Sequence, residues 1–180
     1  MLTENGDPVR RPQRTVFVTV GTTQFNDLVN MACTLEFLLT LQAEGYTELI
    51  IQHGAGPLPK TPTHSPIPVK GFAFKGDLSK EIENAALVIS HAGAGLILES
   101  LSAGKPLLVV VNRGLMDNHQ MDLAVALAKM EVLVWADVED IIDRIAEGGL
   151  QKLKAFGEGD PDRVTSVLEE EAGFVGCASK

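Results

Sequence analysis

The segment Leu87-Val-Ile-Ser-His-Ala-Gly-Ala-Gly95 carries the strongest structural signal in this chain, because it joins a short apolar run to a glycine-rich turn. Leu87–Ser90 is predicted to be a strand, and the turn is predicted to open a helix that ends before Gly104. Glycines there let the main chain approach a ligand closely, and a helix start favours an anion such as a diphosphate. The alternative that Gly93 and Gly95 only permit a tight turn stays open at this point.

The same alternation of strands and helices continues on both sides of this segment. Further strands are predicted at Thr15–Val20, Leu49–Gln52, Val69–Phe74, Pro106–Val111 and Val132–Trp135. Further helices are predicted at Leu28–Ala43, from Asp77 or Ser79 to Ala85, at His119–Met130, from Asp137 to Ala146, and over residues 160–172. We therefore predict an α/β fold, a Rossmann-like parallel sheet with helices on both faces, over residues 15–180. Residues 1–14 are expected to be a flexible lead-in.

Ligands bind beyond the carboxyl ends of the strands in sheets of this kind, which directs attention to three loops. Glu99 lies one turn beyond Gly95, where a carboxylate can accept both hydroxyls of a ribose or can simply complement the helix dipole. Thr22 and Thr23 follow the first strand and offer amides and hydroxyls to phosphate oxygens. The cluster Asn118-His119-Gln120 provides the donors and acceptors that a sugar needs, although Asn118 could also be an ordinary helix cap.

Composition excludes several classes of function. The 180 residues carry a formal net charge of −9, the opposite of the balance that phosphate contacts with nucleic acid require. The same charge disfavours anionic lipid surfaces, and the longest apolar run, Leu107–Val111, is too short to span a bilayer. Residues 1–14 contain arginines but no apolar core of a signal peptide. A soluble cytoplasmic protein without direct membrane insertion is expected.

Metal and nucleophile chemistry have little support in the sequence. Asp160-Pro161-Asp162 matches the Asp-x-Asp pattern of metal-dependent glycosyltransferases, but it has the chemistry of a helix cap. The histidines His53, His64, His91 and His119 lack metal-ligand spacing, and Cys33 and Cys177 are too far apart to suggest a metal site or a disulfide framework. Ser90 does not stand in a Gly-x-Ser-x-Gly elbow. No metal ion and no cofactor are expected.

The motifs gain specificity from their order, which is Phe17-Val-Thr-Val-Gly-Thr-Thr23, Val88-Ile-Ser-His-Ala-Gly-Ala-Gly95 with Glu99, Ala103-Gly-Lys-Pro-Leu107, Val109-Val-Val-Asn112 and Leu115-Met-Asp-Asn-His-Gln120. Together they closely resemble the catalytic subunits of the two-part UDP-N-acetylglucosamine (UDP-GlcNAc) transferase of dolichol-linked oligosaccharide synthesis. They are more distantly similar to the C-terminal, donor-binding domain of the bacterial peptidoglycan GlcNAc transferase. The resemblance covers about residues 15–135.

The resemblance implies half of a GT-B enzyme, in which two Rossmann-like domains enclose the active site. The acceptor-side half is then a membrane-anchored partner subunit, which recruits the cytoplasmic chain to the cytosolic face of the endoplasmic reticulum. The implied reaction transfers GlcNAc from UDP-GlcNAc to dolichyl-diphosphate-GlcNAc with inversion at the anomeric carbon, giving lipid-linked chitobiose for N-glycan synthesis. The donor is a substrate, and amides with a helix dipole can stabilise the departing UDP without a metal.

The resemblance also implies roles for individual residues. Glu99 is expected to bind the ribose, and the expected contacts to the rest of the donor come from Thr22, Thr23, His91, Gly93, Ala94, Gly95, Asn118, His119 and Gln120. Inversion needs a general base. By the resemblance this base belongs to the partner, with His119 as the candidate in this chain. One departure concerns His53-Gly54-Ala55-Gly56, which stands where the family often has Gly-Arg-Gly.

Two other functions compatible with these residues remain open. A complete small enzyme acting on UDP-sugars, such as an epimerase-like enzyme, would turn over the donor without a partner. A non-catalytic UDP-sugar-binding module would keep the fold and lose transfer. The retained Glu99, His119 and Gln120 favour the transferase.

Overall fold

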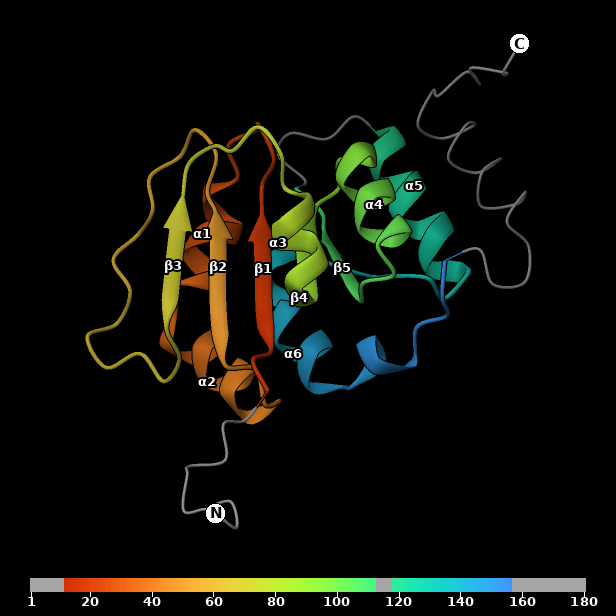
Figure 1. Cartoon of the computed structure of the whole chain (residues 1–180). Helices are drawn as coiled ribbons and strands as arrows, with labels where there is room; N and C mark the ends of the chain where they lie inside the picture. Colours follow the sequence, from red (N-terminus) through yellow and green to blue (C-terminus); the bar gives the residue numbers. More distant parts are fainter. Residues whose placement is uncertain (1–11, 113–117, 157–180) are drawn as a thin grey trace.

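The computed structural model describes residues 12–112 and 118–156, which are built around a six-stranded parallel sheet (Figure 1). The strands stand in the order β3-β2-β1-β4-β5-β6. Their bounds are β1 Thr15–Thr19, β2 Glu48–Gln52, β3 Val69–Phe72, β4 Ala85–His91, β5 Leu107–Val110 and β6 Val134–Ala136. Every expected strand is present to within two residues at each end. The order is that of a doubly wound Rossmann-like sheet, so the predicted fold class is confirmed.

Helices cover both faces of the sheet, as the apolar strands require. The helices are α1 Asn26–Ala32, α2 Leu35–Ala43, α3 Ser79–Asn84, α4 Ala94–Ser102, α5 Asn118–Lys129 and α6 Ile141–Ala146. One core packs α1, α2 and α6 against side chains such as Val16 and Val18, and the other packs α3, α4 and α5 against Phe17. Successive β1 side chains therefore enter opposite cores, which fixes the register of the central strand.

The single helix expected over Leu28–Ala43 is wrong, because the structure divides it into α1 and α2. Thr34 lies between them with φ −75° and ψ 149°, an extended conformation that ends one helix and caps the next. Its hydroxyl donates to the Met31 carbonyl oxygen at 2.8 Å and accepts from the Phe37 amide at 3.3 Å. Thr34 thus satisfies main-chain groups at the end of α1 and at the start of α2.

The C-terminal helices also differ in detail from the expectation. The segment after Asp137 begins as a 3₁₀ turn, Val138–Asp140, before α6, and a further 3₁₀ segment follows at Gly149–Lys152. Gly148 takes φ +68° between them, a conformation that favours glycine and commonly ends helices. The helix predicted over residues 160–172 and most of the lead-in, residues 1–11, lie outside the described residues.

Candidate functional site

The loops that follow β1 and β4 meet at one edge of the sheet, because these two strands are hydrogen-bonded neighbours. β1 and β4 run parallel with Thr19 opposite Ser90, so the loops that follow the two strands leave the sheet at the same edge. From β1 the chain continues towards β2 and β3, whereas β4 continues to β5 and β6 on the other side. This is the topological switch point at which doubly wound sheets bind ligands.

His91 is the centre of this meeting point and lies between two glycines. A Cβ atom on Gly21 would stand 2.7 Å from His91 Cε1, and one on Gly93 would stand 2.5 Å from His91 Nε2. Gly21 also has φ +61°, a conformation that disfavours side chains. The imidazole therefore occupies the space that these glycines leave, so their small size already has an explanation within the chain.

Burial of the His91 imidazole disfavours its charged form. Burial lowers its pKa, and the Thr19 backbone opposes this shift with a smaller effect. Nδ1 is buried and has no hydrogen-bond partner among the described residues.

The start of α4 offers an open main-chain surface beside His91. Gly93 precedes the helix without a side-chain capping bond, and Ala94 and Gly95 form its first turn. Among the described residues, nothing lies within 4 Å of a Cβ atom built on Gly95, in contrast to Gly93. First-turn amides lack intrahelical acceptors and carry the positive end of the helix dipole, so this surface suits an anion.

Glu99 lies on α4 and is partly buried beside the start of α3. The hydroxyl of Ser79 stands 3.3 Å from Glu99 Oε1 and 2.5 Å from Asp77 Oδ1, so one hydroxyl lies between two carboxylates. Hydrogen bonds from the Ser79 side chain and amide hold the pKa of Asp77 below its usual value. The sequence indicated Asp77 and Ser79 only as a helix start, and the contact of Ser79 with Glu99 was missed.

The loop after β1 is held by its own hydrogen bonds. Thr23 donates from both its hydroxyl and its amide to the Val20 carbonyl oxygen, at 2.8 and 3.2 Å. Thr22 is exposed beside it. The loop after β2 packs against this turn, since a Cβ atom on Gly54 would stand 2.3 Å from the Thr23 carbonyl oxygen.

The departure at His53-Gly54-Ala55-Gly56 falls on this packed loop. A Cβ atom on Gly56 would stand 2.4 Å from Asn26 Oδ1, so both glycines are confined, while Ala55 between them is exposed. The side chain at the middle position therefore faces solvent.

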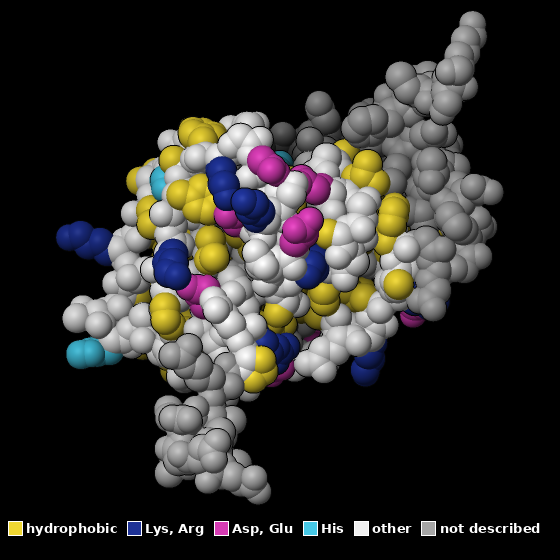
Figure 2. Space-filling model, in the orientation of Figure 1, with side chains coloured by type: hydrophobic (Ala, Val, Ile, Leu, Met, Phe, Trp, Pro, Cys, Tyr) yellow, Lys and Arg dark blue, Asp and Glu magenta, His cyan; other side chains and the backbone are white. Residues whose placement is uncertain are grey.

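An exposed aromatic ring also borders this edge and was not expected as a site residue. Phe74 follows β3 and exposes 57% of its surface. Lys75 beside it pairs with Glu81 of α3 at 2.6 Å. Figure 2 shows hydrophobic side chains exposed among basic and acidic ones on the face of the molecule that is turned to the viewer in Figure 1. The segment from Phe74 to Ser79 leads from the ring to Glu99.

The predicted sugar-binding cluster is only partly visible. α5 begins at Asn118, so Asn118, His119 and Gln120 open a helix as expected. Their side chains lie outside the described residues, and their contacts stay a prediction. Within the described residues no group of three or more His, Cys, Asp or Glu side chains could hold a metal ion. None of the helices described is both long enough and apolar enough to cross a membrane.

Comparisons with known proteins agree with this geometry. The model of the glycosyltransferase family 28 C-terminal domain matches residues 15–163. The UDP-N-acetylglucosamine transferase subunit ALG13 of Yarrowia lipolytica is 33% identical over 169 residues, which cover 87% of this chain and 83% of that protein. The human subunit of the same name is 45% identical over 115 residues, 63% of this chain but 10% of the human protein.

Solved structures show the same arrangement of elements. The solution structure of ALG13 has a TM-score of 0.66 and 28% sequence identity, covering 87% of this chain and 95% of that chain. The crystal structure of MurG from Acinetobacter baumannii has a TM-score of 0.63 over 92% of this chain and 51% of that chain. At 18% identity, the likeness to MurG is one of fold alone.

The sheet order and the two helical layers define the Rossmann-like half of a GT-B glycosyltransferase. Within that class, the chain belongs to the glycosyltransferase family 28 C-terminal domain family. The resemblance recognised in the ordered motifs is thereby confirmed. The human and mouse relatives are much longer than this chain, which matches 10% of each.

Proposed function

We propose that the chain is the donor-binding subunit of a UDP-GlcNAc transferase and acts with a partner that binds the acceptor. The observation that carries this proposal is the meeting of His91 and the start of α4 at the switch point between β1 and β4, with Glu99 further along the same helix. Family membership supports glycosyl transfer, and the relatives named as UDP-N-acetylglucosamine transferase subunits support the donor.

The donor is proposed to lie along the α4 edge. The diphosphate sits against Gly93, Ala94 and Gly95, where amides and the helix dipole complement its charge. Thr22 and Thr23 border the same anion from the loop after β1. This placement uses the open space beside Gly95.

The nucleoside is proposed to extend from there towards α3. Glu99 accepts both ribose hydroxyls, a pairing in which an ionised acceptor strengthens each bond. The uracil stacks on Phe74, which is exposed at the end of β3 on the segment that leads to Glu99. The GlcNAc moiety is assigned to Asn118, His119 and Gln120 at the start of α5.

The proposed reaction is a single displacement. The acceptor hydroxyl oxygen attacks the anomeric carbon, the bond from that carbon to the diphosphate oxygen breaks, and UDP leaves with the electron pair. A general base takes the hydroxyl proton, and we assign this base to the partner. Negative charge that grows on the departing diphosphate is stabilised by the α4 amides, so the proposal needs no metal ion.

The proposed acceptor is dolichyl-diphosphate-GlcNAc, and the partner is a membrane-anchored subunit at the cytosolic face of the endoplasmic reticulum. The word "subunit" in the names of the relatives supports a multi-chain enzyme. The single Rossmann-like sheet of the described residues agrees with one half of a GT-B site.

The test combines the purified full chain with membranes that carry the anchored partner but lack their own soluble subunit. Labelled UDP-GlcNAc and dolichyl-diphosphate-GlcNAc are supplied, and the lipid-linked disaccharide is measured. We expect product only when chain and membranes are combined, with inverted configuration at the new linkage. Saturable UDP-GlcNAc binding without product would instead favour a binding module. Donor turnover by the chain alone would favour an epimerase-like enzyme.

A further inference from the structure

Gln52 is a buried polar residue at the carboxyl end of β2, and none of the roles above includes it. Its surface is 2% exposed. Nε2 donates to the Gly21 carbonyl oxygen at 2.6 Å and to the Ala73 carbonyl oxygen at 3.0 Å. Oε1 accepts from the Thr19 hydroxyl at 2.5 Å. Both amide protons and the amide oxygen are therefore in use.

These bonds join two loops that follow strands which are not adjacent in the sheet. β2 separates β1 from β3, so the loops after β1 and β3 have no strand pairing in common. Gly21 lies against His91 and precedes Thr22, whereas Ala73 precedes Phe74. The Gln52 side chain thus connects the loop beside the proposed phosphate site to the segment that carries Phe74. We call the Phe74 ring, on which the uracil is proposed to stack, the platform.

Thr19 extends the connection on the β1 side. Its hydroxyl donates to Gln52 and accepts from the Gly21 amide at 3.2 Å. Gly21 is consequently held through both its amide and its carbonyl oxygen. Main-chain bonds reinforce the β3 side, where the Gly54 amide donates to the Ala73 carbonyl oxygen at 3.1 Å.

We propose that Gln52 is a positioning residue that fixes the separation between the loop at Gly21 and the platform at Phe74, so that one nucleoside diphosphate engages both. The inference rests on the donor site proposed above. A ligand that spans two subsites gains affinity over its fragments only when the subsites stand at the span of the ligand. The affinity of UDP therefore depends on Gln52 more strongly than the affinity of either fragment does.

The test measures UDP, uridine and pyrophosphate binding to the full chain and to Gln52→Met. Met keeps the length of the side chain and removes both donors. We expect UDP to bind about tenfold more weakly or worse, while uridine and pyrophosphate each change less than about threefold. A purely structural role would weaken the three ligands by similar factors.

Thr19→Val provides a second variant in case Gln52→Met fails to fold. It removes the hydroxyl, keeps the branched shape, and leaves both donated bonds of Gln52 in place. We expect a smaller loss, about threefold for UDP, again without a matching loss for the fragments.

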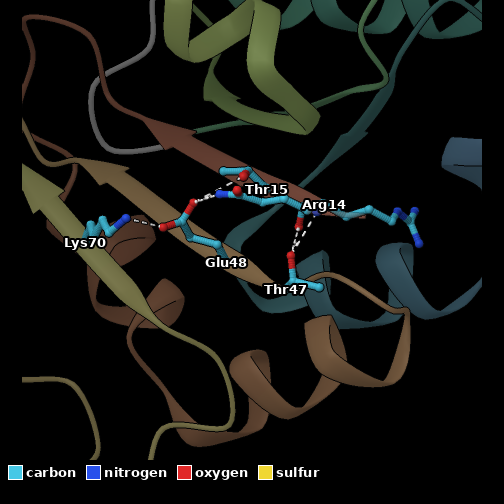
Figure 3. A network of polar contacts seen from close by, with 6 residues as sticks. Arg14, Thr15, Thr47, Glu48 and Lys70 are labelled. Carbon is cyan, nitrogen blue, oxygen red and sulfur yellow. Dashed lines mark hydrogen bonds and ion pairs between the residues drawn. The ribbon is translucent and has the colours of Figure 1, made fainter. Parts of the chain in front are cut away.

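The matched control is Glu48→Gln, a buried hydrogen-bonded residue at the opposite end of the same strand (Figure 3). It should leave all three affinities within about twofold. Equal losses for UDP and its fragments in a folded Gln52 or Thr19 variant, or no loss for UDP, would overturn the role of Gln52 alone. A wild-type chain that binds none of the three ligands would overturn the donor site itself, and the role of Gln52 with it.

Discussion

The two ends of β2 each carry a buried polar residue, and the two residues differ in the kind of group that they bond to. At the amino end, Glu48 accepts from Lys70 at 2.5 Å, from Gln13 at 2.6 Å and from Thr15 at 3.3 Å (Figure 3). At the carboxyl end, Gln52 bonds to main-chain carbonyl oxygens of two loops. At the amino end the contacts of Glu48 are with other side chains. At the carboxyl end Gln52 donates instead to main-chain carbonyl oxygens and so holds two loops in place.

The difference shows where the fold keeps polar groups available for a ligand. Around Glu48 the carboxylate is satisfied by side chains of β1, β3 and the segment before β1. At the other end, His91 Nδ1 has no partner among the described residues, Thr22 is exposed, and the space beside Gly95 is open. At the amino end both oxygens of the Glu48 carboxylate are paired, whereas at the carboxyl end of β4 a buried imidazole nitrogen has no partner among the described residues.

The largest expected effect belongs to Glu99→Ala. We expect UDP binding to weaken about 100-fold or more, roughly 3 kcal/mol, because two charge-assisted hydrogen bonds to ribose are lost. Transfer with the partner should be abolished. The free energy of unfolding should change by no more than about 0.5 kcal/mol, since the polar contact that this carboxylate makes with the described residues is a 3.3 Å one to Ser79.

Calorimetry with UDP, the transfer assay and urea unfolding check this prediction. Glu83→Ala, at an exposed carboxylate on α3, is the matched control and should leave binding unchanged. Unchanged transfer by Glu99→Ala would falsify the ribose assignment.

Gly95→Ala should separate binding from stability with opposite signs. No atom of the described residues lies within 4 Å of the added methyl, and alanine favours a helix over glycine by about 0.5–1 kcal/mol, so the variant should be more stable. If the diphosphate approaches this main chain closely, the same methyl should weaken UDP binding about tenfold, or about 1.4 kcal/mol.

Gly104→Ala at the far end of α4 supplies the control for this pair of measurements. Gly104 has φ +66°, and within the part of the chain that the structure describes an added Cβ meets no atom within 4 Å, so alanine should destabilise the fold by about 1 kcal/mol through its backbone conformation and spare UDP binding. Equal UDP affinity of Gly95→Ala and the wild type would place the diphosphate elsewhere.

Glu48→Gln tests how much the paired carboxylate at the amino end of β2 stabilises the fold. Hydrogen bonds, above all from Lys70, hold the pKa of Glu48 below its ordinary value against the opposing effect of burial. A depressed carboxyl pKa stabilises the fold above the unfolded value, about 4.5, and this contribution disappears as the pH falls through the folded pKa.

We therefore expect Glu48→Gln to lower the free energy of unfolding by about 1 kcal/mol at pH 7. The deficit should shrink below about pH 4.5 as the wild-type carboxyl group becomes protonated. Urea unfolding at pH 7 and pH 3 measures both quantities. A deficit that stays the same at both pH values would show that charge has no part in the stability of this end.

The sequence predicted the strands well because both faces of this sheet are covered and its strands are therefore apolar throughout. It also placed Glu99 on the helix after the glycine-rich turn. The sequence analysis missed the helix break at Thr34. A threonine three residues before the amide that it caps, here that of Phe37, is a recognisable capping signal. The sequence analysis could not have found Gln52, because the partners of that side chain are main-chain groups 31 and 21 residues away. Ser79 beside Glu99 was hidden for the same reason, because the two residues are 20 positions apart in the sequence.

The smallest expected effect is the pH dependence that His91 contributes. Burial lowers its pKa, so the unfolded chain binds a proton more readily than the folded chain does. Stability should therefore fall as the pH drops through the unfolded value near 6.5 towards the folded pKa. His91→Gln removes this group, and the wild type should lose up to about 1 kcal/mol more than the variant between pH 7.5 and 5.5.

Urea unfolding at several pH values measures this slope, with His64→Gln in the exposed loop between β2 and β3 as the control for the loss of one histidine. Parallel slopes for the wild type and His91→Gln would mean that the buried imidazole costs the folded chain nothing on acidification. Both ends of the sheet lose stability in acid, but for opposite reasons: His91 resists gaining a charge near neutral pH, whereas Glu48 resists losing one below pH 4.5. Two separate pH windows would therefore assign each loss to its own end of the sheet.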